Sequence, residues 1–70
     1  MRKWVSESGG ERSKRFVIEE DEGIGFYLYV FDGEKCVKDY LQDTLDFAIE
    51  QAEEDFGVCR ETWKPVDQSG

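Results

Sequence analysis

The 70-residue sequence contains no histidine. Histidine is the commonest general base and the commonest metal ligand in proteins, so its absence removes the usual catalytic and metal-binding sets. The two cysteines, Cys36 and Cys59, are too far apart for a zinc motif, and no glycine-rich segment has the lysine and spacing of a phosphate-binding loop. We therefore expect no catalytic residue, no metal ligand and no cofactor.

The sequence also has no long hydrophobic run. The longest, at 26–31, has six residues, whereas a membrane-spanning helix needs about 20. No secretory signal is recognisable, and two cysteines are too few for the disulfide framework of a small secreted protein. We expect a cytoplasmic protein without membrane contact, in which Cys36 is a buried thiol and Cys59 a partly exposed one.

Positive charge is scarce outside the N-terminus. Residues 1–15 carry five Lys and Arg against two Glu, whereas residues 16–70 carry four against fifteen Asp and Glu, for a net charge of −8. An acidic body repels nucleic-acid phosphates, so no nucleic acid is expected as a partner. The basic segment is expected to stay solvated or to lie against the acidic body. We interpret the acidic run at 19–22 as a solvated turn.

A chain of this length forms one small domain, and its 14% aromatic content supplies large side chains for a core. Residues 1–13 are predicted to be a basic N-terminal arm, either mobile or an edge strand. Residues 14–66 are predicted to form a single α+β domain, and residues 67–70 a tail. If "RKWV" is a strand, we expect it to pair with the strand that follows.

Runs rich in Val, Ile, Phe and Tyr, separated by "EDEG" and "DG" turns, predict a three-stranded antiparallel meander. A two-residue turn at 32–33 pairs Leu28 with Val37, and a three-residue turn at 21–23 pairs Ile18 with Phe26. Alternation then predicts two faces. The core face comprises Phe16, Ile18, Phe26, Leu28, Val30, Val37 and Leu41. The second, mostly aromatic face comprises Val17, Tyr27, Tyr29, Phe31, Cys36 and Tyr40.

Residues 44–56 are predicted to form a helix, because Asp43 or Thr44 can cap its start and Gly57 can end it. Its apolar stripe suits the core face of the sheet. The stripe contains Leu45, Ala48, Ile49, Ala52 and Phe56. We predict an α+β fold: a three- to four-stranded antiparallel β-meander packed on one face by a single C-terminal α-helix, about 44–56. The chain then ends in an extended C-terminal tail, since Pro65 favours an edge or extended segment.

Two groups of aromatic residues lack a predicted cover. Phe47 falls opposite the apolar stripe of the helix, and Trp63 is expected to pack on Phe47 or on the aromatic face. That face needs Trp4, Trp63 or another molecule. The candidate interaction surface comprises Tyr27, Tyr29, Phe31, Tyr40, Phe47 and Trp63.

Three motifs, "GFYLYVF", "DYLQDTLDFAIEQAEEDFGV" and the tryptophan that follows, resemble a family of small bacterial proteins of unknown function. The resemblance covers about residues 16–64. It implies a short antiparallel meander with one helix and a bacterial cytosolic origin. It implies no catalytic or ligand-binding residue.

These features predict a small non-enzymatic interaction module without a small-molecule substrate. It is expected to bind a protein partner, or itself as a homodimer, through the aromatic sheet face. An alternative is an acidic inhibitor or antitoxin-like protein that binds a basic target by charge complementarity. A remote alternative is an accessory enzyme subunit that contributes carboxylates to a shared site.

Overall fold

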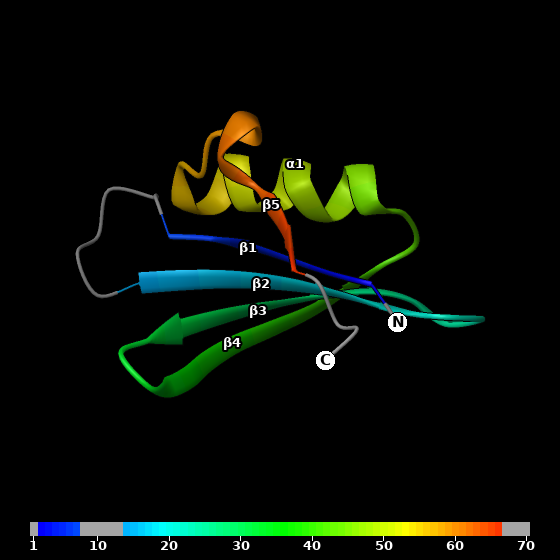
Figure 1. Cartoon of the computed structure of the whole chain (residues 1–70), viewed down its shortest axis with the longest axis horizontal. Coiled ribbons are helices and arrows are strands. Elements are labelled where there is room, and N and C mark those ends of the chain that lie inside the picture. The colour runs from blue at the N-terminus through cyan, green and yellow to red at the C-terminus, as the bar shows by residue number, and fades with distance from the viewer. Residues whose placement is uncertain (1, 8–13, 67–70) are drawn as a thin grey trace.

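A computed structural model describes residues 2–7 and 14–66 of the chain. One sheet and one α-helix form two layers, with the helix lying across a single face of the sheet (Figure 1). The elements are β1 (Lys3–Ser6), β2 (Lys14–Asp21), β3 (Gly25–Asp32), β4 (Lys35–Gln42), α1 (Leu45–Phe56), the 3-10 turn η1 (Arg60–Thr62) and β5 (Lys64–Val66). The strand order is β4-β3-β2-β1-β5, and all neighbours are antiparallel. The predicted α+β fold is confirmed, with one strand more than expected.

The core lies between the sheet and α1. Its fully buried members are Phe16, Ile18, Leu28, Val30, Ala48, Ala52 and Val58. Burial of each large aliphatic or aromatic side chain stabilises the fold by roughly 1.5–3 kcal/mol. The two alanines have no exposed surface, so α1 sits close to the strands. Leu45, Ile49 and Phe56 pack against the same core, which confirms the predicted stripe.

Both ends of α1 carry the signals expected from the sequence. The backbone N–H of Phe47 donates to Thr44 Oγ1 over 3.1 Å, so Thr44 rather than Asp43 is the N-cap. Gly57 ends the helix with φ of 73°. The N–H of Gly57 donates to the Glu53 carbonyl and that of Val58 to the Ala52 carbonyl. This closing pattern buries Val58 beneath the last turn.

The β2–β3 turn is two residues out of the predicted register. Ile18 pairs with Leu28 rather than with Phe26, and the loop is 22–24 because β2 continues through Asp21. The N–H of Ile24 donates to the Asp21 carbonyl over 2.9 Å. A shift of two residues keeps every side chain on its predicted face.

The predicted register between β3 and β4 was wrong, and the observed register places the second half of β4 with its side chains on the opposite faces of the sheet from those predicted. The turn is 33–34, and a β-bulge follows, so Leu28 pairs with Tyr40 instead of Val37. Tyr40 therefore turns toward α1, where its ring lies 6.4 Å from that of Phe56. Leu41 pairs with Tyr27 and is 50% exposed. The predicted core positions of Val37 and Leu41 are wrong, and so is the predicted burial of Cys36, since the first half of β4 is an exposed edge.

The first and last strands along the chain, β1 and β5, pair with each other in the sheet. β1 pairs with β2 as expected, and its other edge pairs with β5, so β1 is an interior strand. Proline has no backbone N–H, which suits Pro65 to the outer strand β5. The predicted arm at 1–13 thus supplies an interior strand rather than an edge strand. The remainder of the arm at 8–13 and the predicted tail at 67–70 lie outside the described residues.

The basic N-terminal residues contact the acidic run. Arg2 Nε donates to Glu20 Oε1 over 2.7 Å, and Lys3 Nζ lies 3.5 Å from Glu19 Oε2. The hydrogen bond from Arg2 lowers the pKa of the Glu20 carboxyl below its ordinary value. This part of the basic segment lies against the acidic body, which was one of the two expected arrangements.

Candidate interaction surface

The side of the sheet that faces away from α1 is called here the open face, and the strand register defines its residues. Directly opposite residues in antiparallel strands share a face, so rows of side chains run across the sheet. The first row is Lys64, Val5, Val17, Tyr29 and Asp39, and it crosses all five strands. The second row is Val66, Lys3, Glu19, Tyr27 and Leu41. A shorter third row is Arg15, Phe31 and Cys36.

Aromatic side chains occupy the middle of the open face on β3. The rings of Tyr27 and Tyr29 are stacked, with centroids 5.9 Å apart and an interplanar angle of 18°. The guanidinium carbon of Arg15 lies 5.2 Å from the ring centroid of Phe31. All three rings are half-buried by their neighbours, and Val17 beside them is buried. Together they form a continuous apolar centre.

Burial raises the pKa of the Tyr29 hydroxyl above its ordinary value, and the negative charge of Glu19 adds to the effect. Because Tyr29 is protonated at neutral pH, the centre of the face carries a neutral hydroxyl. That group can donate or accept a hydrogen bond with a bound molecule.

The predicted surface residues fall into three places. Tyr27, Tyr29 and Phe31 lie together on the open face. Tyr40 lies on the opposite side of the sheet, and Trp63 packs against the core. Phe47 projects from α1 and is 53% exposed. The surface expected to be continuous is therefore divided between the open face and the helix.

Neither tryptophan covers the tyrosines. Trp4 pairs with Ile18, so it lies on the helix side of the sheet, where its ring is 6.1 Å from that of Phe26. Trp63 packs on the core beside α1, and the expectation that it covers Phe47 or the aromatic face was wrong. Within residues 2–7 and 14–66, α1 covers one side of the sheet (Figure 1). Both tryptophans pack against the core on that side, whereas Tyr27 and Tyr29 lie on the other.

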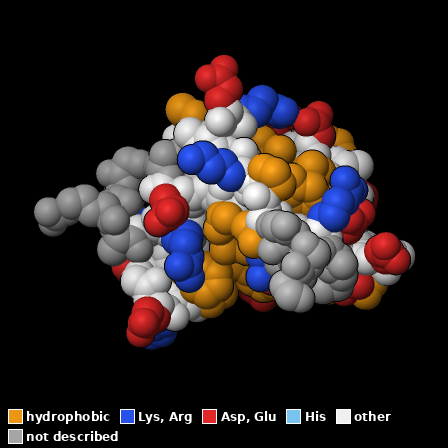
Figure 2. Space-filling model, viewed as in Figure 1, with side chains coloured by type: hydrophobic (Ala, Val, Ile, Leu, Met, Phe, Trp, Pro, Cys, Tyr) orange, Lys and Arg blue, Asp and Glu red, His pale blue; other side chains and the backbone are white. Residues whose placement is uncertain are grey.

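Val5, Lys64 and Asp39 are among the open-face residues that the sequence did not predict. Val5 and Lys64 reach it through the β1–β5 pairing, and Asp39 reaches it through the bulged β3–β4 register. Pairing between distant strands leaves no local sequence signal. Lys64 and Asp39 are exposed at opposite ends of the first row. Acidic and basic side chains are interspersed with hydrophobic ones in the view of Figure 2.

A second exposed surface lies along the outer side of α1. Phe47 borders a hollow of about 290 Å³. The other residues that line it are Gln42, Glu50, Gln51, Glu54 and Asp55. Three carboxylates and one exposed aromatic ring thus line the same hollow, an arrangement that favours a positively charged group over an anion.

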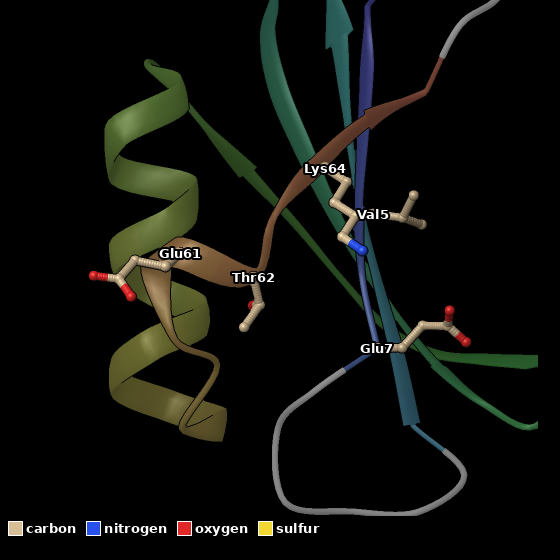
Figure 3. A pocket seen from close by; sticks show the side chains of 5 residues that line it. All are labelled: Val5, Glu7, Glu61, Thr62 and Lys64. Atoms are coloured by element: carbon tan, nitrogen blue, oxygen red, sulfur yellow. The ribbon is translucent and has the colours of Figure 1, made fainter.

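Another hollow, of about 520 Å³, lies beside β5 and η1. Val5, Thr62 and Lys64 line it, with Glu7 and Glu61 (Figure 3). The two carboxylates point away from each other in Figure 3. Thr62 Oγ1 donates to the Cys59 carbonyl over 2.6 Å, so its proton is already engaged. The lining therefore presents no pair of groups arranged for acid–base work.

In the described part of the chain, no three or more carboxylates or cysteines are close enough together to hold a metal ion. No helix among the same residues has the length and apolar character needed to cross a membrane. Comparisons of the chain with family models, with curated proteins and with solved structures found no match.

Proposed function

We propose that the chain is a small non-enzymatic interaction module that binds a protein partner, or a second copy of itself, through the open face. The observation that carries this proposal is the grouping of Tyr27, Tyr29 and Phe31 on a side of the sheet that α1 and both tryptophans leave open. Sheets of small domains normally bury one apolar face in the core and solvate the other. Here the second face has an apolar centre.

The composition of the open face suits protein recognition. Tyrosine brings a large contact area with little rotamer freedom to lose, which is why it is enriched at interfaces. Lys3, Arg15, Glu19, Asp39 and Lys64 surround the aromatic centre, and a polar rim around an apolar centre is the usual anatomy of an interface.

A cytoplasmic location, with no nucleic-acid partner, belongs to the same proposal. Cys36 and Cys59 are both exposed free thiols, which persist in a reducing compartment. The net charge of −8 disfavours contact with phosphate backbones.

The test compares the two exposed aromatic surfaces. Two variants alter the open face: the double variant Tyr27→Ser/Tyr29→Ser and the single variant Leu41→Glu. A third variant, Phe47→Ser, alters the outer side of α1. We expect the open-face variants to abolish binding, measured as self-association by sedimentation and as partner retention from lysate, while Phe47→Ser binds normally. Circular dichroism establishes that each variant is folded, and Leu41→Glu provides the test if the double serine variant unfolds. Equal binding by folded Leu41→Glu and wild type would contradict the proposal.

A second candidate function is favoured by the exposed ring of Phe47 among Glu50, Glu54 and Asp55. This surface suits a basic segment of another protein, as expected for an acidic inhibitor or antitoxin-like protein. Such binding would weaken strongly between 50 and 500 mM salt, on the order of tenfold or more, because exposed charges are screened. It would be lost in Phe47→Ser and retained in Leu41→Glu, the reverse of the pattern expected for the open face.

A further inference from the structure

We propose that the occupant of the open face is a second copy of this chain, related to the first by a two-fold axis that runs along the strands. This inference rests on the proposed function and identifies the partner. A two-fold dimer uses the same patch on both copies, so the patch must be complementary to itself. The first row of the open face has this property.

The first row has opposite charges at its two ends. It begins with Lys64 on the outer strand β5 and ends with Asp39 on the outer strand β4, and both side chains are exposed. Between them lie Val5, Val17 and Tyr29, which are apolar or neutral. A row that is basic at one end, apolar in the middle and acidic at the other end matches a copy of itself turned end for end.

The two-fold axis that achieves this match runs parallel to β2 and passes over Val17. It reverses the order of the strands, so that β4 of one copy lies over β5 of the other. Lys64 then faces Asp39 of the other copy twice, once at each edge of the interface. Val5 faces Tyr29 twice, and Val17 meets its own counterpart at the axis. Two sheets packed face to face with nearly aligned strands have the geometry of ordinary β-sandwiches.

The second row is compatible with the same axis. Val66 would face Leu41, which gives the half-exposed leucine an apolar neighbour. Lys3 would face Tyr27, a pairing of a cation with an aromatic ring. Glu19 lies at the axis and meets its counterpart, but Lys3 of the same copy is 3.5 Å from its carboxylate and offsets part of the repulsion. Arg15 of the third row also lies on β2 and meets its counterpart, a second like-charge pair, with each guanidinium over the Phe31 ring of its own copy.

The alternative two-fold axis in the plane of the face, directed across the strands along the first row, brings like charges together at the ends of that row. It would set Lys64 opposite Lys64 and Asp39 opposite Asp39, which places like charges together at both ends of the row. The same axis would also place Glu19 opposite Arg15, because both lie on β2 on either side of Val17. The end charges of the first row are therefore the feature that distinguishes the two arrangements, and they favour the axis along the strands.

The size of the face predicts a weak dimer. Five strands about 4.8 Å apart give roughly 19 Å between the outer strand axes. The whole molecule measures 32 × 28 × 23 Å, so the contact is a modest part of its surface. Interfaces that bury less than about 1,200 Å² in total, or about 600 Å² per partner, are generally weak or transient, and we expect a dissociation constant in the micromolar range.

The test reverses the two end charges separately. Lys64→Glu gives two repulsive pairs in each dimer, and so does Asp39→Lys. We expect each variant alone to dimerise about tenfold more weakly than wild type, since two exposed pairs are lost and two repulsions gained. In an equimolar mixture of the two variants both pairs between residues 64 and 39 are attractive again, so dimers should reform at nearly wild-type affinity. Lys38→Glu, an equivalent charge change on the helix side of the sheet, is the control and should dimerise like wild type.

Sedimentation velocity over a concentration series distinguishes the outcomes, with circular dichroism to establish folding. Wild-type dimers that both variants weaken and their mixture restores would support the proposed arrangement. Dimers that neither variant weakens, or that the mixture fails to restore, would overturn it. A wild type that stays at 8.2 kDa up to millimolar concentration would overturn the second copy as occupant. In that case, if the wild type retains another protein from lysate and Leu41→Glu does not, the proposed function stands with a different partner. If the wild type retains no protein, the proposed function and the dimer are both contradicted.

Discussion

Two adjacent residues, Tyr40 and Leu41, show how much the position of one side chain depends on the register of its strand. Tyr40 pairs with Leu28 and packs on the core beside Phe56, whereas Leu41 pairs with Tyr27 on the open face. The register predicted from a two-residue turn without a bulge would place Tyr40 on the open face and Leu41 in the core. Their substitution by alanine therefore tests the bulged register directly.

We expect Tyr40→Ala to lower the free energy of unfolding by about 2 kcal/mol, because it leaves a cavity beside Phe56. Leu41→Ala should cost less than about 1 kcal/mol in the monomer, since the side chain is 50% exposed. Urea denaturation at low protein concentration measures both values. A larger loss for Leu41→Ala than for Tyr40→Ala would contradict the register.

The raised pKa of Tyr29 predicts a dependence of stability on pH. The folded state keeps the hydroxyl proton where the unfolded chain has begun to lose it, so stability falls as pH rises above the ordinary tyrosine value of about 10. The Tyr29→Phe variant lacks this group and should lose less stability between pH 9 and 11. Urea midpoints across that range provide the measurement, and identical pH profiles for the two proteins would contradict the prediction.

At the scale of elements, the β2–β3 hairpin depends on a glycine that has no room for a side chain. Gly25 has φ of 149°, and a Cβ there would lie 2.5 Å from the backbone carbonyl oxygen of Gln42. Gly23, in the adjoining turn, has φ of 85° and open space around it. We expect Gly23→Ala to cost about 1 kcal/mol from backbone strain alone and Gly25→Ala clearly more, because β3 and β4 must also separate. Equal costs in thermal or urea unfolding would be inconsistent with this close approach.

The elements also differ in how far the sequence determines them. Helix α1 was predicted to within a residue because its signals, the cap at Thr44, the αL glycine at Gly57 and the apolar stripe, are local. The β3–β4 register was not, because a bulge adds a residue without any mark in the alternation. Tyr27 and Tyr29 share a face by position in one strand, so they were predictable. Asp39 and Lys64 depend on the bulge and on pairing between the two ends of the chain.

At the scale of the whole molecule, the described residues form a sheet with one apolar face, a second face with an apolar centre, and one helix. The helix covers the first face with Ala48 and Ala52, and the second is the open face. A chain of 70 residues buries only roughly 60% of its unfolded surface. Burial of the open face in a dimer would therefore add to the stability of each copy.

This linkage predicts that thermal stability depends on protein concentration. If only the folded chain dimerises, the midpoint of thermal unfolding rises as the protein concentration increases. We expect the wild-type midpoint to rise by a few degrees between about 5 and 500 µM, and the midpoint of Lys64→Glu to change less over the same range. Calorimetry at several concentrations measures this. A wild-type midpoint independent of concentration would argue against dimerisation in that range.

The most direct test of the open face as the site of self-association is a concentration series of amide NMR spectra of the wild-type chain. The expected result is a set of concentration-dependent shifts at Val5, Val17, Tyr29 and Asp39, with the amides of α1 around Phe47 unchanged. Shifts confined to α1, or an absence of shifts up to millimolar protein, would contradict the assignment of the open face to a second copy.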